Sequence, residues 1–192
     1  MSRLDKQIAF LTEADRLKTV LRATTLCDGS RIENSAEHSW HIALYAMVLA
    51  EHAEEDVDVL KILKMLLLHD LVEIDAGDAP VFGDHDEEAL AAKEAAAAER
   101  IFGLLPDDQA KTFRAIWEEF EANETPEAEF AKSIDRLQPP IQNLQSGGGS
   151  WTQFDVTLSR FEAHIGPKIN RGAPGIWEWL RPQVAAFFNA RL

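Results

Sequence analysis

The residues best suited to chemistry are an adjacent histidine and aspartate, His69 and Asp70, which follow the apolar run 62–68. Buried polar groups need hydrogen-bond partners and a buried charge needs a counter-charge, so this pair is unfavourable in an apolar helix without compensation. A divalent cation would satisfy both side chains. Glu73 follows at i+4 from His69 and at i+3 from Asp70, and this spacing predicts that the three side chains share one helix face.

Two further residues are candidates to complete a metal site with this pair. His38 lies upstream, and Asp135 lies downstream in the apolar-flanked segment 130–137. Each candidate has an ordinary structural explanation by itself, but the joint arrangement is hard to obtain by accident. Two imidazole nitrogens and two carboxylate oxygens suit a divalent ion such as Mn²⁺, Co²⁺, Fe²⁺, Zn²⁺ or Mg²⁺. The metal ligands predicted from the sequence are His38, His69, Asp70 and Asp135.

An ion with these four ligands and six coordination positions would keep two open, one for water and one for a substrate oxygen. Such an ion makes water a better nucleophile source at neutral pH and polarises a phosphoryl oxygen. Glu73 is then placed to orient or deprotonate the water. Asp78 follows Gly77 just past the expected helix end, and we expect it to position or protonate the leaving oxygen. The remaining histidines have no supporting motif: His41, His52, His85 and His164.

The composition predicts one soluble globular domain. Its 192 residues are enough to bury a core, and 46% of them are hydrophobic with charges interleaved. The net charge of −14 disfavours nucleic acids, which bind mainly through Lys and Arg, but it allows a small phosphorylated ligand held by a metal and local cations. No apolar run approaches the ~20 residues that cross a bilayer, and the N-terminus lacks a signal-peptide pattern. Because Cys27 is the single cysteine, we expect a cytoplasmic protein with no internal disulfide.

Nearly every segment has apolar residues at helical spacing, and we find no alternating pattern typical of a strand. The helix starts include a capping box at 34–37. The expected helices run through 10–21, 34–52, 56–74, 87–102, 106–120, 125–137 and from 174 onward. We expect Pro139 and Pro140 to kink or end the helix that begins near 125, and 147–150 to form a flexible loop. The fold prediction is an all-α single domain over 1–192, with a motif-bearing core over about 5–145 and C-terminal helices over about 151–192.

The motifs resemble those of the HD superfamily of metal-dependent phosphohydrolases, and within it the branch of HD-domain 5′-deoxynucleotidases. The matching segments are RIENSAEHS at 31–39, LHDLVEIDAGD at 68–78 and FAKSID at 130–135, with weaker matches at 104–106 and 117–121. The resemblance covers about 5–145. It implies an HD-type helical bundle with the metal between helices, held by the four ligands named above. It also implies that Glu73 serves the attacking water and that Asp78 contacts the sugar or the leaving oxygen.

The resemblance further implies an arginine near the end of the first helix that binds the substrate phosphate, and Arg22 is the nearest counterpart. Arg forms bidentate bonds to phosphate that Lys cannot reproduce, and so acidic a chain must supply local positive charge to a dianion. Lys18 and Arg31 are the alternatives. Ala23 follows Arg22, whereas the 5′-deoxynucleotidases have an aromatic residue there, so the deoxy-versus-ribo preference stays open.

The leading hypothesis is a metal-dependent phosphomonoesterase, a 5′-nucleotidase acting on (deoxy)nucleoside 5′-monophosphates. One alternative is an HD hydrolase of another small phosphorylated compound, and a second is a catalytically silent HD protein that binds a ligand. A homodimer is expected because the family often dimerises and because the last segment is rich in aromatic residues. Alternatively, this helix simply closes the core. The aromatic residues in question are Trp177, Trp179, Phe187 and Phe188.

Overall fold

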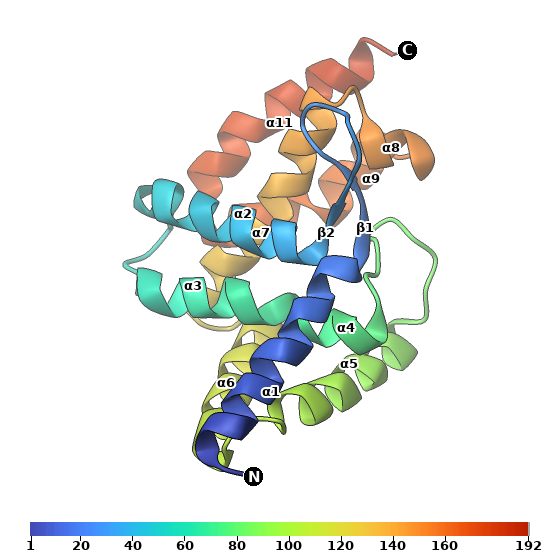
Figure 1. Cartoon of the computed structure of the whole chain (residues 1–192). Coiled ribbons are helices and arrows are strands. Elements are labelled where there is room, and N and C mark those ends of the chain that lie inside the picture. Colours follow the sequence, from blue (N-terminus) through green and yellow to red (C-terminus); the bar gives the residue numbers. More distant parts are fainter. Residues whose placement is uncertain (192) are drawn as a thin grey trace.

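The computed structural model describes residues 1–191 as helices joined by short connections, with one small antiparallel hairpin (Figure 1). The all-α prediction is confirmed, and no helix within 1–191 is long and apolar enough to span a membrane. The α-helices are α1 (Arg3–Ala14), α2 (Ser35–Leu49), α3 (Val59–Leu68), α4 (Glu73–Ala76), α5 (Glu87–Phe102), α6 (Asp107–Ala122), α7 (Pro126–Gln145), α8 (Gly149–Gln153), α9 (Leu158–His164), α10 (Gly166–Gly172) and α11 (Pro174–Asn189). The 3-10 helices are η1 (Asp15–Thr19), η2 (Ala50–His52) and η3 (His69–Val72), and the strands are β1 (Leu21–Thr25) and β2 (Ile32–Asn34).

The hairpin corrects the sequence prediction, which continued the first helix to Leu21. Helix α1 ends at Ala14, and after η1 the chain enters β1, which pairs antiparallel with β2. The Leu26 N–H donates to the Arg31 carbonyl at 2.9 Å and closes the turn between the strands. The strands are short and their pairing is irregular, so no alternating pattern marks them in the sequence. As a consequence Arg22 projects from a strand rather than from a helix end.

The starts of α2 and α3 are set by side-chain caps. The capping box predicted for α2 is confirmed, because the Glu37 N–H donates to Asn34 Oδ1 at 3.0 Å and the Asn34 N–H donates to Glu37 Oε2 at 3.3 Å. Helix α3 begins after Asp58, not after Asp56. Asp58 Oδ1 accepts hydrogen bonds from the backbone N–H groups two and three residues further on, at 2.9 and 3.2 Å.

The prediction of one continuous helix through the His-Asp pair is wrong. Helix α3 ends at Leu68, His69 and Asp70 lie in η3, and Glu73 begins the short α4. His69 Nδ1 lies 2.9 Å from the carbonyl oxygen of Leu66, which is the acceptor that the Asp70 N–H would use in a regular α-helix. The change to 3-10 geometry therefore coincides with the point where the imidazole takes that carbonyl.

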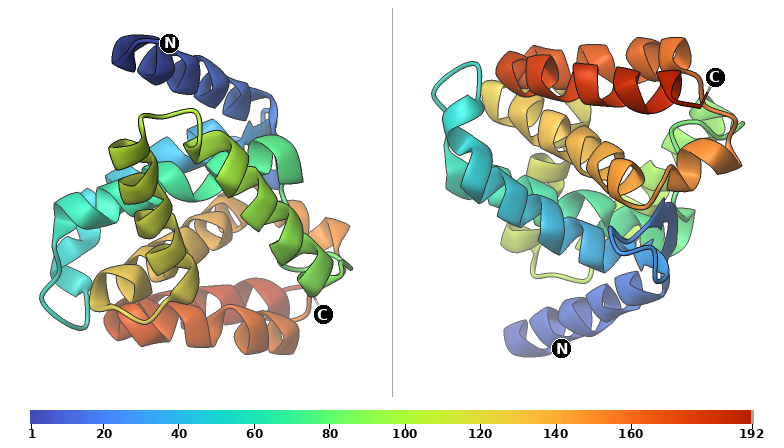
Figure 2. Two further views of the ribbon diagram at one scale, coloured as in Figure 1. Left: turned by 90° about the horizontal axis from the view of Figure 1, so that it is seen from below. Right: turned by 90° about the horizontal axis from the view of Figure 1, so that it is seen from above.

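Helix α7 runs through the centre of the fold, between α2 and α3 on one side and the C-terminal helices on the other (Figure 2). It contains Pro139 and Pro140 and continues to Gln145, so the expected early end is wrong. Ile134 and Leu137 of this helix are buried against the neighbouring helices. This tertiary burial outweighs the tendency of the two prolines to break the helix. The expected flexible loop at 147–150 is also partly helical, because α8 begins at Gly149.

Two clusters of buried apolar side chains meet at η3. One surrounds α7 and includes residues of α2, α3 and the C-terminal helices. The other lies between α1, α5 and α6 and includes Leu68, Leu71 and Val72. The His-Asp pair lies between these two clusters, where side chains from separate elements can converge.

The aromatic residues of the C-terminal helix pack inward. Trp177, Phe187 and Phe188 are partly buried against the first cluster, and the ring of Trp151 lies 5.3 and 5.0 Å from the rings of the two phenylalanines. Trp179 alone among the four predicted surface aromatics is largely exposed, at 58%. The structure therefore supports the alternative, in which α11 closes the core of the domain.

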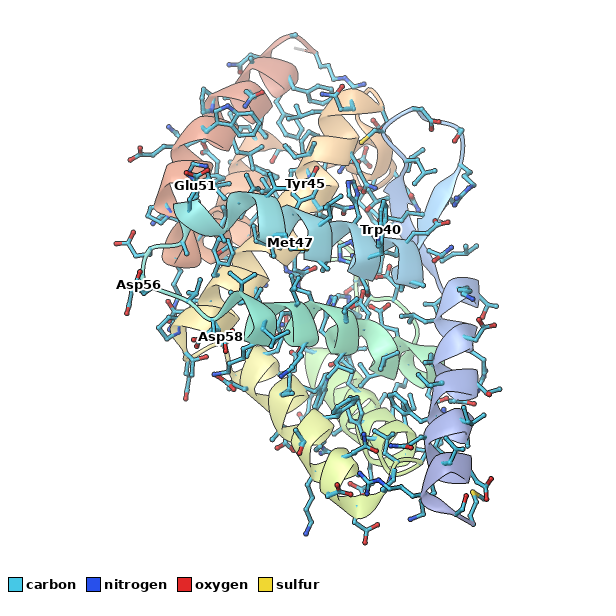
Figure 3. All side chains as sticks on the ribbon, turned by 60° about the vertical axis from the view of Figure 1, so that its left-hand side comes forward. Trp40, Tyr45, Met47, Glu51, Asp56 and Asp58 are labelled. Atoms are coloured by element: carbon cyan, nitrogen blue, oxygen red, sulfur yellow. The ribbon has the colours of Figure 1, made fainter. Side chains whose placement is uncertain are left out.

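An exposed apolar surface lies on α2. Trp40, Leu44, Met47 and Val48 are 63%, 43%, 60% and 65% exposed. Figure 3 shows Trp40 and Met47 on the outer side of this helix. The segment 40–50 contains no Asp, Glu, Lys or Arg, which is unusual for a surface in so acidic a chain.

Candidate metal centre and active site

A cavity of about 270 Å³ opens beside η3, and most of the predicted site residues contribute to its wall. They come from a strand, a 3-10 helix, two α-helices and a turn, so the tertiary fold is needed to bring them together. Helix α4 ends at Gly77, whose φ of +80° turns the chain toward Asp78. The predicted residues in the wall are Arg22, His69, Asp70, Glu73, Asp78 and Asp135. His38 lies behind this wall and is fully buried.

Three predicted metal ligands converge on one point. His38, His69 and Asp135 each offer a ligand atom, and these atoms lie within 4.8 Å of one another. Asp135 Oδ1 is 3.0 Å from His38 Nε2 and 3.8 Å from His69 Nε2. Asp70, the fourth predicted ligand, has its Oδ1 2.8 Å from the same His69 Nε2. Asp70 therefore lies next to the cluster of His38, His69 and Asp135 but is not a member of it.

The hydrogen bonds of the two imidazoles indicate what this cluster suits. His38 Nδ1 lies 3.0 Å from Gln138 Oε1, and His69 Nδ1 lies 2.9 Å from a backbone carbonyl, so both oxygens accept from an Nδ1–H and each Nε2 is the atom that could bind a metal. Both Nε2 atoms face carboxylate oxygens, that of His38 the Asp135 Oδ1 and that of His69 the nearer Asp70 Oδ1. His69 Nε2 is buried without a hydrogen-bond partner within residues 1–191. Two imidazole nitrogens and carboxylate oxygens are a donor set that fits a divalent metal ion, which would take the place of the proton on an imidazole.

A buried carboxylate supports His38 from behind, and sequence reasoning did not identify it. Glu33 Oε1 accepts hydrogen bonds from Gln138 Nε2 and Gln142 Nε2, both at 2.8 Å. The first bond orients the Gln138 amide so that its oxygen faces His38 Nδ1. Outer partners of this kind set the tautomer of a metal-binding histidine. Glu33 begins the pattern E-N-x-x-E-H within the motif at 31–39, so the sequence marks its position but not its role.

The charges of the site alter the pKa values of its ligands. Burial and the Arg22 charge lower the pKa of His38, but hydrogen bonds with Asp135 and Glu33 and the Asp70 charge outweigh them and raise it to about 9. Burial raises the pKa of Asp70, but the neighbouring His69 and Arg22 lower it to about 2. Burial likewise opposes ionisation of Asp135, and Arg136 with the histidines holds its pKa well below the usual range. Both aspartates are therefore ionised, as metal ligands must be.

Glu73 and Asp78 have the opposite electrostatic character. Burial, followed by the charges of Asp70 and Asp78, raises the pKa of Glu73 well above its usual value. Burial, together with the Asp70 charge, also raises the pKa of Asp78, although Arg22 opposes the shift. Ser35 Oγ donates to Glu73 Oε2 at 2.5 Å and fixes this carboxyl group. Groups whose pKa values lie closer to neutral pH suit proton transfer.

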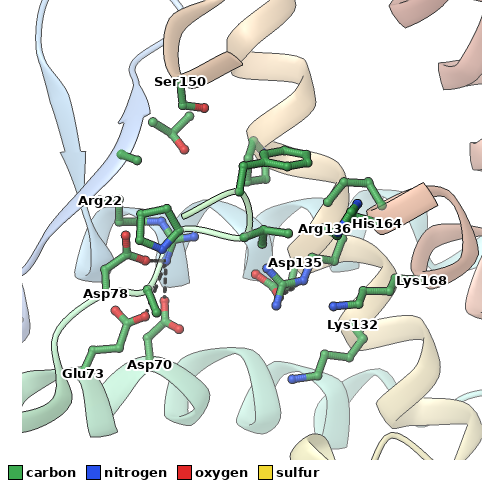
Figure 4. Close-up of a pocket in the computed structure, with 18 of the residues that line it drawn as sticks. Arg22, Asp70, Glu73, Asp78, Lys132, Asp135, Arg136, Ser150, His164 and Lys168 are labelled. Carbon is green, nitrogen blue, oxygen red and sulfur yellow. Dashed lines mark hydrogen bonds and ion pairs between the residues drawn. The ribbon is translucent and has the colours of Figure 1, made fainter. Parts of the chain in front are cut away.

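Arg22 is the predicted phosphate-binding residue that reaches the cavity. Its guanidinium Nη1 donates to Asp70 Oδ2 at 3.1 Å, drawn as a dashed line in Figure 4, and lies 3.4 Å from Asp78 Oδ1 and 3.9 Å from Glu73 Oε1. Its Nε lies 3.9 Å from Glu33 Oε2. Arg22 thus holds the carboxylates of the site in a fixed arrangement around one buried cation.

The two alternatives to Arg22 lie elsewhere. Lys18 forms an exposed ion pair with Asp15. Arg31 binds both carboxylate oxygens of Glu37, at 2.8 and 2.7 Å, on the surface of the hairpin. Neither lines the cavity.

The cavity also has basic residues that sequence reasoning did not assign. Figure 4 shows Lys132, Arg136, His164 and Lys168 on the side opposite Arg22. Lys132 lies within the motif at 130–135 and Arg136 directly follows it, so their position near the site has a signal in the sequence. The C-terminal helices that carry the other two lie outside the motifs and give no such signal. The cavity wall also includes His85 and His164, two histidines that no sequence motif supports.

Comparisons with known proteins agree with this architecture. A family model described as "HD domain" matches residues 14–177, which extends well beyond the segment 5–145 expected from the motifs. The 5′-deoxynucleotidase HDDC2 from Homo sapiens is 28% identical over 161 residues, covering 80% of this chain and 78% of that protein. A 5′-deoxynucleotidase from Shewanella oneidensis is 28% identical over 143 residues, covering 70% and 73%.

A crystal structure of a predicted metal-dependent phosphohydrolase from Magnetospirillum magnetotacticum MS-1 superposes with a TM-score of 0.90. It is 45% identical and covers 97% of this chain and 96% of the other. The sequence match and the structural match each span most of the chain. The resemblance stated from the His-Asp motifs is confirmed, and this chain belongs to the HD-domain family.

Proposed function

We propose that this protein is a divalent-metal-dependent phosphohydrolase that acts as a 5′-nucleotidase, releasing phosphate from (deoxy)nucleoside 5′-monophosphates. The observation that carries the proposal is the pair of imidazole Nε2 atoms that face the carboxylates of Asp135 and Asp70, beside a cavity that also holds two carboxyl groups of raised pKa. The names of the HD-domain relatives, 5′-deoxynucleotidase and metal-dependent phosphohydrolase, support the same reaction class.

The metal ligands in this proposal are His38, His69, Asp70 and Asp135. A divalent ion there supplies Lewis-acid chemistry, because it polarises a phosphoryl oxygen and makes water more acidic. A hydrolysis screen with Mn²⁺, Co²⁺, Fe²⁺, Zn²⁺ and Mg²⁺ identifies which ion supports activity.

The remaining residues handle protons and the phosphate group. Glu73 accepts the proton of the attacking water, and its raised pKa suits a base that works near neutral pH. Asp78, whose pKa is also raised, gives a proton to the leaving oxygen or positions it. Arg22 binds the phosphate oxygens, exchanging part of its contact with the carboxylates for a bidentate contact with the substrate.

A hydrolysis screen tests this function. Chelator-stripped protein receives each of the candidate divalent ions in turn, and phosphate release is measured from ribo- and deoxyribonucleoside 5′-monophosphates. Metal-dependent release from these substrates is the expected result. Release of pyrophosphate from nucleoside triphosphates, with no reaction of the monophosphates, would contradict the proposal.

A second candidate is hydrolysis of another small phosphorylated compound. The observation that favours it is Ala23, which lines the cavity directly after Arg22 where the resemblance leads us to expect an aromatic residue. A small side chain at this position removes a surface on which a deoxyribose or base would pack. Non-nucleotide monophosphates in the same screen separate the two candidates. A catalytically silent ligand-binding protein, the third hypothesis, requires that no phosphate is released from any of them.

We also propose a homodimer formed through the exposed face of α2. Trp40, Leu44, Met47 and Val48 form an uncharged apolar surface, so two acidic chains can meet there without charge repulsion. Two-fold pairing of identical surfaces is the commonest assembly of soluble proteins. The cytoplasm is the proposed location, where the exposed thiol of Cys27 stays reduced.

A further inference from the structure

The cavity has two sides with different charge balance (Figure 4). On one side Arg22 lies among carboxylates from η3, α4 and the following turn. On the other side lie Lys132 and Arg136 of α7 and Lys168 of α10, which we call the cationic wall. The proposed function uses the first side and Asp135, and it leaves the cationic wall without a role.

The fold holds the three cations of the wall together. Lys132 and Arg136 are four residues apart on α7, so they project from successive turns of one face. Helix α10 packs along this helix, and Ser133 Oγ of α7 lies 3.1 Å from the carbonyl oxygen of Lys168. A Cβ atom at Gly172 would collide with the backbone of α7, so the glycine is what permits this close approach. The backbone of Lys168 is therefore held beside the turn that carries the other two cations.

Four carboxylates lie near the cationic wall, but Glu87 and Glu94 form no ion pair with it within 4 Å among residues 1–191. Lys132 Nζ contacts Glu121 Oε1 at 3.0 Å, while Arg136 Nε lies 3.5 Å from Asp135 Oδ2 and is buried without a hydrogen bond. Lys168 has no carboxylate within ion-pair distance among residues 1–191. Burial, together with the charges of Arg136 and Lys132, lowers the pKa of the Lys168 ammonium.

Like charges held together in this way are destabilising unless an anion joins them. A group of cations that lacks close carboxylate partners is unusual in a chain of net charge −14, where carboxylates are abundant. Arg22 shows the contrast, because four carboxylates lie within 4 Å of its guanidinium. The cationic wall therefore has capacity for a negative group from outside the protein.

We propose that the cationic wall binds a second anionic group of the substrate, so that the preferred substrate is a phosphomonoester carrying a further phosphate, such as a nucleoside 3′,5′-bisphosphate. This inference rests on the proposed function and refines its substrate class. The scissile phosphate lies at the metal ligands and Arg22, and the second phosphate lies between Lys168 and Arg136. Lys132 adds charge to the same group while it remains paired with Glu121.

The test compares matched pairs of substrates on the metal-loaded protein. Adenosine 5′-monophosphate is paired with adenosine 3′,5′-bisphosphate, and fructose 6-phosphate with fructose 1,6-bisphosphate, so that nucleotide and sugar sources of the second phosphate are distinguished. We expect the adenosine bisphosphate to have a kcat/KM about 10- to 100-fold above its monophosphate, the range for one added charge-assisted hydrogen bond. In Lys168→Ala this ratio falls toward one, mainly through KM. The control Lys111→Ala, an exposed lysine of α6 away from the cavity, keeps it.

The outcomes separate the inference from the function on which it rests. Equal kcat/KM values for both members of each pair, or a ratio that Lys168→Ala leaves intact, overturn the second anion site while the phosphohydrolase stands. A preference confined to the sugar pair retains the second anion site but overturns the nucleotide assignment. If no compound is hydrolysed, the proposed function fails. Calorimetric titration of adenosine 3′,5′-bisphosphate into wild-type protein and Lys168→Ala then decides the inference alone, because weaker binding by the variant supports the site and equal binding overturns it.

Discussion

Ser35 Oγ and Glu73 Oε2 lie 2.5 Å apart, so the first residue of α2 holds the first residue of α4. The contact connects the segment before His38 to the segment after Asp70. It occupies one Glu73 oxygen and leaves the other 3.9 Å from the Arg22 guanidinium. Glu73 is thereby oriented beside the cluster of His38, His69 and Asp135 without being a member of it.

Substitution of Glu73 tests its assignment as the base. Glu73→Gln should keep the bound metal and lose about 10²- to 10⁴-fold in kcat, because proton transfer is removed while the ligands remain. Metal content by elemental analysis and phosphate release are measured on the same sample. Ser35→Ala should show a smaller loss, since the base remains but is less well oriented. Loss of metal together with activity in Glu73→Gln would make Glu73 a ligand instead.

Asp70 tests the metal centre. Asp70→Ala removes a predicted ligand and one carboxylate partner of Arg22, so metal binding and activity should both be abolished. Wild-type protein should gain melting temperature when metal is added, because an ion that binds the folded state stabilises it by mass action. The variant should show little of this gain in thermal unfolding with and without metal. Wild-type metal affinity in Asp70→Ala would show that the ion binds elsewhere.

Local signals were enough to predict several helices. Helix α5 has the predicted bounds 87–102, because Asp86 accepts from the Ala89 N–H at its start and Gly103 follows its end. The prediction failed where tertiary contacts decide the backbone. Helix α7 continues past Pro139 because its neighbours bury it, and η3 departs from α geometry where an imidazole takes a backbone carbonyl.

The residues of the candidate site also fall into two groups, those that the sequence indicates and those that only tertiary packing brings together. The convergence of His38, His69 and Asp135 was predictable because metal chemistry restricts residue type and the motifs fix their spacing. The roles of Glu33 and Gln138 were not, because a buried carboxylate and amide acquire their role only from the residues packed around them. The third cation of the cationic wall, Lys168, comes from a helix outside the motifs, and only packing against α7 brings it to the cavity.

We expect Arg22 to bind the substrate phosphate in addition to its ion pairs with the carboxylates of the site. Arg22→Lys keeps one positive charge among the carboxylates but loses the planar fork that binds two phosphate oxygens. We expect kcat/KM to fall by at least about tenfold, the loss of one charge-assisted hydrogen bond, measured by steady-state phosphate release. Lys18→Ala, which changes an exposed lysine paired with Asp15, is the control and should behave as wild type. An unchanged kcat/KM in Arg22→Lys would remove Arg22 from the substrate site.

The metal-free protein should lose stability as the pH rises from 6.5 to about 9. The folded pKa of His38 is raised to about 9 from an unfolded value near 6.5, so its contribution is present in full below pH 6.5 and is lost as the pH rises through 9. The loss corresponds to up to about 3 kcal/mol. Thermal unfolding of chelator-treated protein across this range measures it, and His38→Gln should flatten the dependence. Metal-loaded protein should not show the loss, because a metal replaces the proton. A metal-free protein that gains stability over this range would contradict the assignment.

The α2 surface predicts how two chains associate. Val48→Glu places a charge within the uncharged apolar face and should convert a dimer into a species near the 21.5 kDa chain mass in sedimentation at micromolar concentration. Leu4→Glu on α1 is the matched control, because Leu4 and Val48 are both 65% exposed. Deletion of α11 would not test the interface, since Trp177, Phe187 and Phe188 pack into the core and their removal would destabilise the fold. Wild-type protein that sediments at the mass of one chain would refute the dimer. A dimer that survives Val48→Glu but dissociates in Leu4→Glu would move the interface to α1.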